Sequence, residues 1–416
     1  MSEIEVHISL EGETERVGTL FRQASRGRES VTFEYHPDWQ ASGRRFSLEP
    51  GLAVSAGMFH PGAGREMFGS IGDSAPDTWG RRLMQRAERR QAQAEDRPPR
   101  TLHEADFLLG VSDISRLGAL RFKKPDDTAF QKPLGEGVPG FVQLGRLLDS
   151  ARRIERDEET DEDLSLIFAP GSSLGGARPK ASIMDAHGNL AIAKFPKDSD
   201  DYSIETWEHI ALTLAKRAGI RVPVHELHHV GEKPVLVSWR FDREDERRVP
   251  FLSAMAMLQA KDGERSSYPE IVDELTQHGA RAGEDSSELF RRMIFNILIS
   301  NVDDHLRNHG FLWAGRDGWV LSPAYDLNPT PTDLKARILT TNISLDEGTC
   351  SIDLAMAQAD LFGLSTKDAA KIVSETGKAV AQWRTVAAQL GQSKTQIDRM
   401  ASAFEHDDLV FACRKN

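Results

Sequence analysis

The chain has 416 residues, of which 39% are hydrophobic, so it is long and apolar enough to form two or three domains with a sizeable core. Its 52 basic and 64 acidic residues give a formal net charge of −12. This charge argues against direct, nonspecific nucleic-acid binding, which depends on Lys and Arg neutralising phosphates. The only cysteines, Cys350 and Cys413, exclude a disulfide framework and a Cys-rich zinc site.

The beginning of the chain is charged and lacks the apolar core of a signal peptide. No apolar run approaches the length of about 20 residues that a membrane span requires. These features predict a soluble, cytoplasmic protein.

Residues 1 to about 60 are predicted to be rich in β-strands, because apolar and polar residues alternate at 6–10 and 31–35. A helix is then expected to begin at Ser74 as its N-cap, with Pro76 in its first turn. Its arginines form either a solvated face or a surface for a partner or a phosphate. They are Arg81, Arg82, Arg86, Arg89 and Arg90.

Residues 125–165 resemble a joint between domains, because Pro and Gly punctuate them and an acidic run follows at 155–163. Such a run is usually solvated, so we interpret it as packing or linker material and not as a metal site. The predicted domains are residues 1–125, 126–245 and 246–416.

Short strands are predicted at 181–184, 190–195 and 234–239, with a helix at 204–218. From about residue 250 the pattern becomes helical, and apolar residues at 289–298 form one helix face. Ser365 and Asp368 resemble a capping box that opens a helix reaching Leu390.

Residues 299–308 contain Asp303 and, five positions later, Asn308. This spacing is typical of the catalytic loop of protein kinases, in which the Asp accepts the proton of the attacking hydroxyl and the Asn binds magnesium. Arg307 could neutralise charge on the transferred phosphoryl group. Asp326 follows where a kinase has its second metal-binding carboxylate. A capping Asp in a polar loop is the alternative interpretation.

Three further parts of a kinase precede this loop in the expected order. Residues 171–180 are rich in glycine and could cradle phosphates with their backbone N–H groups, although an ordinary turn would have the same composition. They form neither a Walker A loop, because Ala177 stands where that motif needs Lys, nor a G-x-G-x-x-G motif. Lys194 ends a predicted strand, and Glu208 on the next helix could pair with it.

The segment His225–His229 fits H-E-x-x-H, the signature of zinc proteases. That motif binds zinc only on a helix, where both histidines share a face. Because Pro223 and Gly231 flank strand-like residues here, we do not expect a zinc site.

Together these residues resemble the HipA family of bacterial serine/threonine kinases, the toxins of type II toxin–antitoxin modules. The most specific matching motifs are residues 173–180, 194–196, 240–243, 303–308 and 325–326. Softer matches are residues 18–20 and 73–77. The resemblance implies an α+β, bilobal, protein-kinase-like fold with an additional N-terminal β-rich domain and a helical C-terminal lobe.

The resemblance also implies a set of site residues. Asp303, Arg307, Lys194 and Glu208 would be catalytic, and Asn308 and Asp326 would bind Mg²⁺. Ser173 would be an autophosphorylation site, with Ser172 as the neighbouring candidate, and its phosphate would repel the nucleotide phosphates. The residues implied to contact ATP are Gly175, Gly176, Ala177, Arg178, Pro179, Lys180, Lys194, Trp239, Arg240, Phe241, His305, Leu306, Arg307, Asn308, Tyr325 and Asp326.

The implied partner is a HipB-like helix-turn-helix antitoxin that binds DNA, so that DNA contact would be indirect. The implied substrate is an aminoacyl-tRNA synthetase, whose phosphorylation stalls translation and leads to dormancy. The chain lacks the His-Arg-Asp, Asp-Phe-Gly and Ala-Pro-Glu motifs of ordinary protein kinases, so it is not expected to share their activation-loop regulation. A small-molecule kinase and a catalytically idle co-repressor of an antitoxin are the alternative functions.

Overall fold

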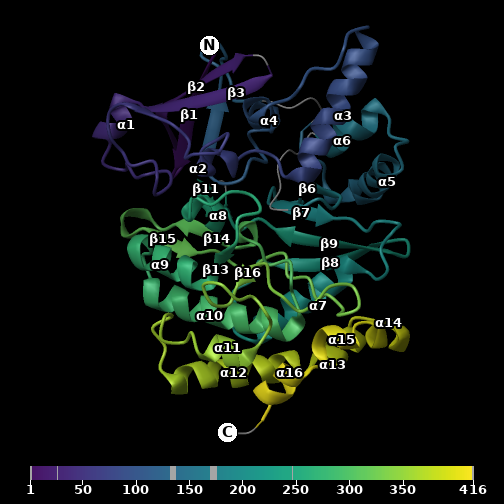
Figure 1. The fold of residues 1–416 in the computed structure, drawn as a ribbon. Helices are drawn as coiled ribbons and strands as arrows, with labels where there is room; N and C mark the ends of the chain where they lie inside the picture. The colour runs from purple at the N-terminus through teal and green to yellow at the C-terminus, as the bar shows by residue number, and fades with distance from the viewer. Residues whose placement is uncertain (1, 26, 132–136, 169–175, 246, 415–416) are drawn as a thin grey trace. The chain divides into compact units, whose positions relative to one another are not determined.

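The protein is described by a computed structural model that covers residues 2–25, 27–131, 137–168, 176–245 and 247–414. The chain divides into two compact units. Unit 1 consists of Met1–Ser199 and His228–Lys261, and unit 2 consists of Asp200–Leu227 and Asp262–Asn416. Figure 1 shows the elements of both, which are described separately below.

Unit 1 begins with an antiparallel five-stranded sheet in the order β4-β3-β2-β1-β5. The predicted alternation is confirmed, because Ile4, Val6 and Ile8 are buried on one face of β1. The strands are β1 (Ser2–Leu10), β2 (Glu13–Ser25), β3 (Arg28–Tyr35), β4 (Met58–Phe59) and β5 (Leu120–Lys123). Short helices accompany the sheet: α1 (Pro37–Ala41), α2 (Gly69–Gly72) and α4 (Glu104–Gly110).

Helix α3 (Thr78–Ala94) begins later than predicted. Its N-cap is Asp77, whose carboxylate accepts a hydrogen bond from the Gly80 amide at 2.9 Å. The backbone carbonyl of Ser74, the predicted cap, instead accepts from the buried guanidinium of Arg116. Asp is a strong N-cap residue, and here Asp77 is the cap instead of Ser74 because its carboxylate also binds Lys180.

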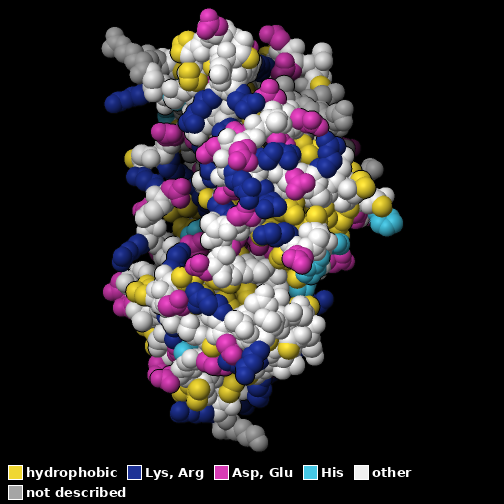
Figure 2. All heavy atoms as spheres, turned by 90° about the vertical axis from the view of Figure 1, so that its right-hand side faces the viewer, with side chains coloured by type: hydrophobic (Ala, Val, Ile, Leu, Met, Phe, Trp, Pro, Cys, Tyr) yellow, Lys and Arg dark blue, Asp and Glu magenta, His cyan; other side chains and the backbone are white. Residues whose placement is uncertain are grey.

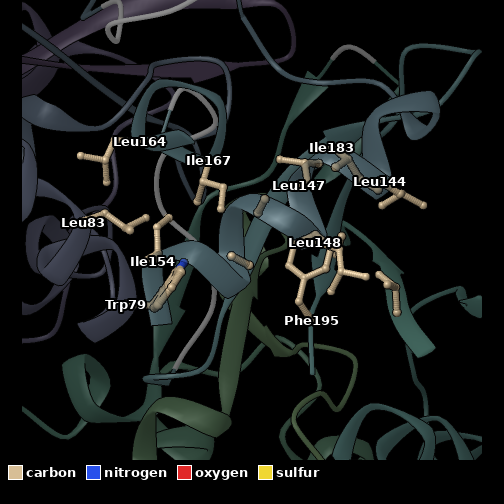
Figure 3. Close-up of a cluster of buried hydrophobic side chains, with 14 of the residues drawn as sticks. Trp79, Leu83, Leu144, Leu147, Leu148, Ile154, Leu164, Ile167, Ile183 and Phe195 are labelled. Atoms are coloured by element: carbon tan, nitrogen blue, oxygen red, sulfur yellow. The ribbon is translucent and has the colours of Figure 1, made fainter. Parts of the chain in front are cut away.

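Two helices occupy most of residues 144–168, so this region packs against the rest of unit 1, the first of the two predicted alternatives, and is not a linker. They are α5 (Leu144–Glu155) and α6 (Asp161–Phe168), and a 3₁₀ turn, η1 (Phe141–Gln143), precedes them. Apolar side chains of both helices pack against α3 and the second sheet of unit 1 in a continuous core (Figure 3). Leu147 and Ile154 are fully buried in it.

The acidic run, of a composition that is usually solvated, is bound by the arginine face of α3. Arg82 contacts Glu155 at 3.3 Å, Arg86 contacts Glu159 at 2.8 Å and also Asp157, and Arg90 contacts Asp161 at 2.6 Å. Each arginine meets its partner about 70 residues along the chain, so local sequence could not reveal the pairing. On the face drawn in Figure 2, Lys/Arg and Asp/Glu side chains accordingly lie next to one another.

The second sheet of unit 1 confirms the predicted strands. It has the order β6-β7-β9-β8, and β6 pairs with β7 in antiparallel register with Lys180 opposite Lys194. The strands are β6 (Lys180–Met184), β7 (Leu190–Lys194), β8 (His225–Val230) and β9 (Lys233–Trp239). The remaining elements of the unit are β10 (Arg243–Glu244), β11 (Arg247–Arg248), β12 (Phe251–Ser253) and α8 (Ala254–Met257).

The H-E-x-x-H segment lies in β8, a strand, as expected from its flanking residues. His225 and His229 are therefore separated by about 13 Å along the strand, at about 3.3 Å per residue, and cannot hold one metal ion together. The ring of His225 instead contacts His209, with 2.9 Å between their Nδ1 atoms.

Unit 2 is mainly helical around α10 (Ala282–Ile299), whose apolar face was predicted. Its other helices are α7 (Ile204–Arg217), α9 (Tyr268–His278), α11 (Ile352–Met356), α12 (Thr366–Val380), α13 (Trp383–Gln389), α14 (Lys394–Arg399), α15 (Ala401–Phe404) and α16 (Asp407–Ala412). Its short strands are β13 (Ser266–Ser267), β14 (Gly310–Trp313), β15 (Trp319–Leu321) and β16 (Thr341–Asn342).

The short strands of unit 2 form two pairs, one of them from distant segments. β13 and β16 are parallel, and β14 and β15 form an antiparallel hairpin. Two 3₁₀ turns, η2 (Leu306–Asn308) and η3 (Gly315–Asp317), complete the unit.

The helix predicted to run from Ser365 to Leu390 is divided into α12 and α13. Its start is confirmed, because Ser365 caps α12 through the Asp368 amide at 3.1 Å. The division places Trp383 on the core, where it stacks on Phe404 with ring centroids 4.6 Å apart. Burial of this aromatic pair outweighs the continuity of a single helix.

His406 gives unit 2 a pH-dependent contact. Its Nε2 faces the Leu298 carbonyl at 3.2 Å, so its Nδ1 is the acceptor for the Leu409 amide and caps α16. Burial, followed by the charge of Arg337, lowers the pKa of His406 to about 4. The unfolded chain therefore binds a proton more readily between pH 6.5 and 4, and the free energy of unfolding falls as the pH drops through this range.

We expect His406 to account for about 2 kcal/mol of lost stability at pH 5 relative to pH 7. His406→Asn keeps a side-chain acceptor at the N-cap and removes the titrating group. In urea unfolding at both pH values, the variant should lose less stability on acidification than the unchanged chain. An equal loss in both proteins would show that His406 does not titrate in this range.

The structure is of the α+β class, as predicted, with a β-rich start, a second small sheet and a helical C-terminal region. Among the residues described above, no helix combines the length and apolar character needed to cross a membrane.

Candidate active site

The Asp303 loop lies at the buried C-terminal end of α10. The last turns of this helix, including Phe295, Leu298 and Ile299, are fully buried. Ser300 then takes a left-handed conformation, with φ 52°, which ends the helix. Its hydroxyl donates to the carbonyl of Ala403 at 2.8 Å. The loop therefore starts from a fixed point in the core.

Asp303 and Asp304 are adjacent in sequence but have opposite environments. The Asp303 side chain is 60% exposed, and its carboxylate lies 3.7 Å from the Lys335 ammonium. Asp304 is 1% exposed, and burial raises its pKa to about 8 even though three donors reach its carboxylate. Of these two carboxylates, only that of Asp303 is exposed, and its role as the catalytic base stays a prediction.

Asn308 has an amide oxygen suited to a metal ion. The residue is 7% exposed, and its Nδ2 donates to the Asp303 carbonyl at 2.9 Å. This bond fixes the amide plane, and the buried Oδ1 has no hydrogen-bond partner among the described residues. A buried acceptor without a partner is costly, and an amide oxygen is a ligand type that Mg²⁺ accepts. The predicted role of Asn308 fits this geometry.

Asp326 lies next to the Asp303 loop, on a segment that the loop itself holds. The Tyr325 hydroxyl donates to the Arg307 carbonyl at 2.7 Å, which joins the two segments. Asp326 has a positive φ of 58°, an uncommon conformation for a residue other than glycine, and it accepts from the Asn328 amide at 3.1 Å. Asn308 and Asp326 thus place an amide oxygen and a carboxylate on two connected segments, and both are ligand types that could hold Mg²⁺.

The side chains between Asp303 and Asn308 differ in their burial and in their hydrogen-bond partners. His305 has a buried Nδ1 without a hydrogen-bond partner among the described residues, and Leu306 is buried. Arg307 is 42% exposed and makes a 3.3 Å contact with Asp262, an exposed carboxylate. A weak, exposed pair of this kind leaves the guanidinium able to turn towards a phosphate.

In unit 1 the end of the Gly-rich segment is fixed by α3. Lys180 forms a buried ion pair with Asp77 at 2.8 Å, and its carbonyl accepts from the Trp79 indole at 3.0 Å. The Trp79 amide reaches the Gly176 carbonyl at 3.4 Å. Asp77 therefore caps α3 and holds Lys180 at once, a role that its place in sequence did not reveal. Gly175, Ser172 and Ser173 lie outside the described residues.

The other predicted contacts in unit 1 surround the end of β9. The Trp239 indole donates to Asp185 at 3.1 Å and stacks on Phe141. Arg240 is buried, and all of its guanidinium nitrogens bind Asp242 or the carbonyls of residues 115 and 116. Arg240 could therefore contact ATP only through its backbone.

The predicted ion pair of Lys194 and Glu208 joins residues of different units. Lys194 ends β7 in unit 1, and Glu208 is a buried residue of α7 in unit 2. Their pairing stays a prediction, as do the ATP contacts of Ala177, Arg178, Pro179 and Phe241.

Two curated relatives have partial matches to this chain. It is 25% identical over 210 residues to a putative kinase of Haemophilus influenzae, an alignment covering 44% of this chain and 61% of the relative. It is 31% identical over 159 residues to the putative kinase Y4dM of Sinorhizobium fredii, covering 34% of this chain and 38% of the relative. The chain therefore spans less than two thirds of the length of each.

A solved structure matches nearly the whole fold. The HipA chain from a Shewanella oneidensis complex of HipA, HipB and operator DNA superposes with a TM-score of 0.71 at 18% identity, covering 99% of this chain and 96% of that one. At this identity the likeness concerns the fold, and it confirms the predicted fold class.

Two domain families match consecutive parts of the sequence. Residues 7–105 match the HipA N-terminal domain, and residues 172–383 match the HipA-like C-terminal domain. The second match alone covers half of the 416 residues and includes Lys194, the Asp303 loop and Asp326. The chain belongs to the HipA family.

Proposed function

We propose that this protein is an ATP- and Mg²⁺-dependent serine/threonine protein kinase that acts as the toxin of a type II toxin–antitoxin module. The observation that carries the proposal is the Asp303 loop. Asp303 has an exposed carboxylate, and Asn308, held by the Asp303 backbone carbonyl, has a buried amide oxygen with no hydrogen-bond partner among the described residues. The putative-kinase relatives and the family match support the same reaction class.

In the proposed reaction, a serine or threonine hydroxyl attacks the γ-phosphorus of ATP. A new O–P bond forms, the bond between the γ-phosphorus and the bridging oxygen breaks, and ADP leaves. Asp303 accepts the hydroxyl proton, and Arg307 faces the charge on the transferred phosphoryl group. Asn308 and Asp326 would hold Mg²⁺, which neutralises charge on the nucleotide phosphates.

Unit 1 is proposed to supply the phosphate cradle and the strand lysine. Residues 175–180 would approach the phosphates, and Lys194, oriented by Glu208, would pair with them. Ser173 is the proposed autophosphorylation site, where about two added negative charges would repel the nucleotide phosphates.

The proposed partner is a HipB-like helix-turn-helix antitoxin that contacts DNA on behalf of the complex. The structure of the Shewanella oneidensis HipA is of a complex with HipB and its operator DNA. The net charge of −12 supports DNA binding by the antitoxin, because an acidic chain binds DNA phosphates poorly by itself. The proposed substrate is an aminoacyl-tRNA synthetase, and the proposed location is the cytoplasm.

The function is tested by incubating the purified chain with labelled ATP, Mg²⁺ and a panel of aminoacyl-tRNA synthetases. We expect phosphoserine or phosphothreonine on a synthetase and growth arrest on expression without the antitoxin. Phosphate on a metabolite, with no arrest, would indicate a small-molecule kinase. Absence of MgATP binding in calorimetry would indicate an idle co-repressor.

A further inference from the structure

In unit 2, a continuous chain of hydrogen-bonded buried side chains connects the Asp303 loop with the segment that contains Asp326 and Asn328. The Asn328 amide N–H donates to Asn301 Oδ1 at 3.1 Å, and Asn301 Nδ2 donates to Asn296 Oδ1 at 3.1 Å. Asn296 Nδ2 donates to the Tyr268 hydroxyl at 2.9 Å, which donates to Asp304 Oδ2 at 2.7 Å. Asn301, Asn296, Tyr268 and Asp304 are each at most 2% exposed.

The donor-to-acceptor direction of these hydrogen bonds is fixed by the backbone N–H of Asn328. A backbone N–H can only donate, so Asn301 must present its oxygen to Asn328 and its NH₂ to Asn296. The same choice then follows at Asn296, and the Tyr268 proton is directed to Asp304. Every dipole points towards one carboxylate, and aligned hydrogen bonds of this kind strengthen one another.

One end of the chain of hydrogen bonds is Asp304, the residue that follows the proposed base, and the other end is Asn328, which contacts Asp326. Asp304 directly follows Asp303, and its carboxylate also accepts from the amides of Thr340 and Thr341 at 2.9 and 3.2 Å. At the other end, Asn328 Nδ2 donates to Asp326 Oδ1 at 3.1 Å. The position of the metal carboxylate is thereby tied to that of the base.

Asn328 has one group left over. Its backbone N–H donates to Asn301, and its carbonyl accepts from the Thr330 hydroxyl. Its Nδ2 donates to Asp326. Its Oδ1 is buried and has no hydrogen-bond partner among the described residues. Because Oδ1 and Nδ2 belong to one amide group, a donor that satisfies Oδ1 lies next to the Asp326 carboxylate. Asn308 Oδ1, in the adjoining loop, is buried without a partner in the same way.

We propose that Asn328 is a further residue of the metal site. It orients Asp326 through Nδ2 and accepts a hydrogen bond from a water of the bound Mg²⁺ through Oδ1, while the chain from Asn301 to Asp304 fixes its position. Mg²⁺ usually keeps several of its waters in protein sites, and residues that hold ligands or waters from outside strongly affect affinity. Asn328 is thus a positioning residue, and this inference rests on the proposed function.

Asn328→Ala in the full-length chain tests the inference. With Mn²⁺ as the probe and a non-hydrolysable ATP analogue present, electron paramagnetic resonance should show a rise in the Kd for Mn²⁺ of about 10- to 100-fold. The Kd for the analogue measured in EDTA should not change. The matched control is Asn342→Ala, which removes a buried asparagine whose amide contacts the Leu345 carbonyl at 3.5 Å, and its Mn²⁺ affinity should stay as in the unchanged chain.

Two further variants keep the inference falsifiable. Asn328→Ser preserves a small polar side chain if the alanine variant does not fold, and it should show the same loss of Mn²⁺ affinity. Tyr268→Phe keeps the buried ring, breaks the chain in its middle, and should weaken Mn²⁺ binding by a smaller factor. Unchanged Mn²⁺ affinity in Tyr268→Phe would overturn the role of the chain.

The outcomes separate this inference from the proposed function. If the unchanged chain binds Mn²⁺ with nucleotide and transfers phosphate, while both Asn328 variants bind Mn²⁺ equally well, the role of Asn328 is wrong and the kinase proposal stands. If the unchanged chain binds neither metal nor nucleotide, the proposed function is wrong and the metal site falls with it.

Discussion

Asp303→Ala is expected to lower phosphoryl transfer by about 10²- to 10⁴-fold, the range typical of removing a general base. The carboxylate is exposed and is the proposed acceptor of the hydroxyl proton, whereas the adjacent Asp304 is buried and bound by three donors. MgATP affinity should change little, because Asn308 and Asp326 remain. Initial rates with labelled ATP, together with calorimetry of MgATP binding, measure both quantities.

The matched control is Asp317→Asn, which alters an exposed aspartate of η3 in the same unit and should leave the rate unchanged. Transfer by Asp303→Ala at the rate of the unchanged chain would contradict the assignment of the base. A variant that lost MgATP binding together with activity would show that Asp303 acts on the nucleotide and not on the substrate hydroxyl.

Asp242→Ala is expected to lower the free energy of unfolding by about 3–5 kcal/mol, the cost of leaving buried charges without their partner. Asp242 is fully buried and contacts Arg240 at 2.5 Å, Arg243 at 2.7 Å and the Gly118 amide at 2.7 Å. Burial alone would raise the pKa of Asp242, but the two guanidinium groups hold it below its usual range. Urea denaturation measures the loss.

Asp126→Ala serves as the control, because this aspartate is exposed in the same unit and should change stability by less than about 0.5 kcal/mol. The replacement of Asp242 leaves two arginines facing each other in the core beside the end of β9. A loss no larger than that of the control would mean that solvent reaches these arginines.

Two outcomes in unit 1 share one physical cause. The composition of the acidic run is compatible with packing or with a linker, and Arg86 and Arg90 of α3, which bind it from about 70 residues away, decide for packing. The start of α3 was placed at Ser74, although Asp77 is the cap because it also binds Lys180. In each case a distant residue decided between local alternatives of similar energy.

Candidate functional residues can be proposed from the sequence where the chemistry needs a fixed spacing within one short loop. Asp303 and Asn308 are candidates because a base and a metal ligand five residues apart form a motif in themselves, and Asp326 is a candidate from its order along the chain. The chain of asparagines was missed, since Asn296, Asn301 and Asn328 show no spacing typical of a known site. The sequence signal for these residues would be asparagines within the apolar segments next to the Asp303 and Asp326 motifs.

The sequence by itself determined the fold class, the strands and main helices, the family and the order of the kinase parts, because periodicity, turn residues and motif spacing are local properties. Only the tertiary structure decided which of two adjacent aspartates is exposed, how the arginines of α3 are neutralised and how Asp326 is connected to the base loop. These outcomes depend on burial and on hydrogen bonds between segments far apart in the chain, and no local pattern records them.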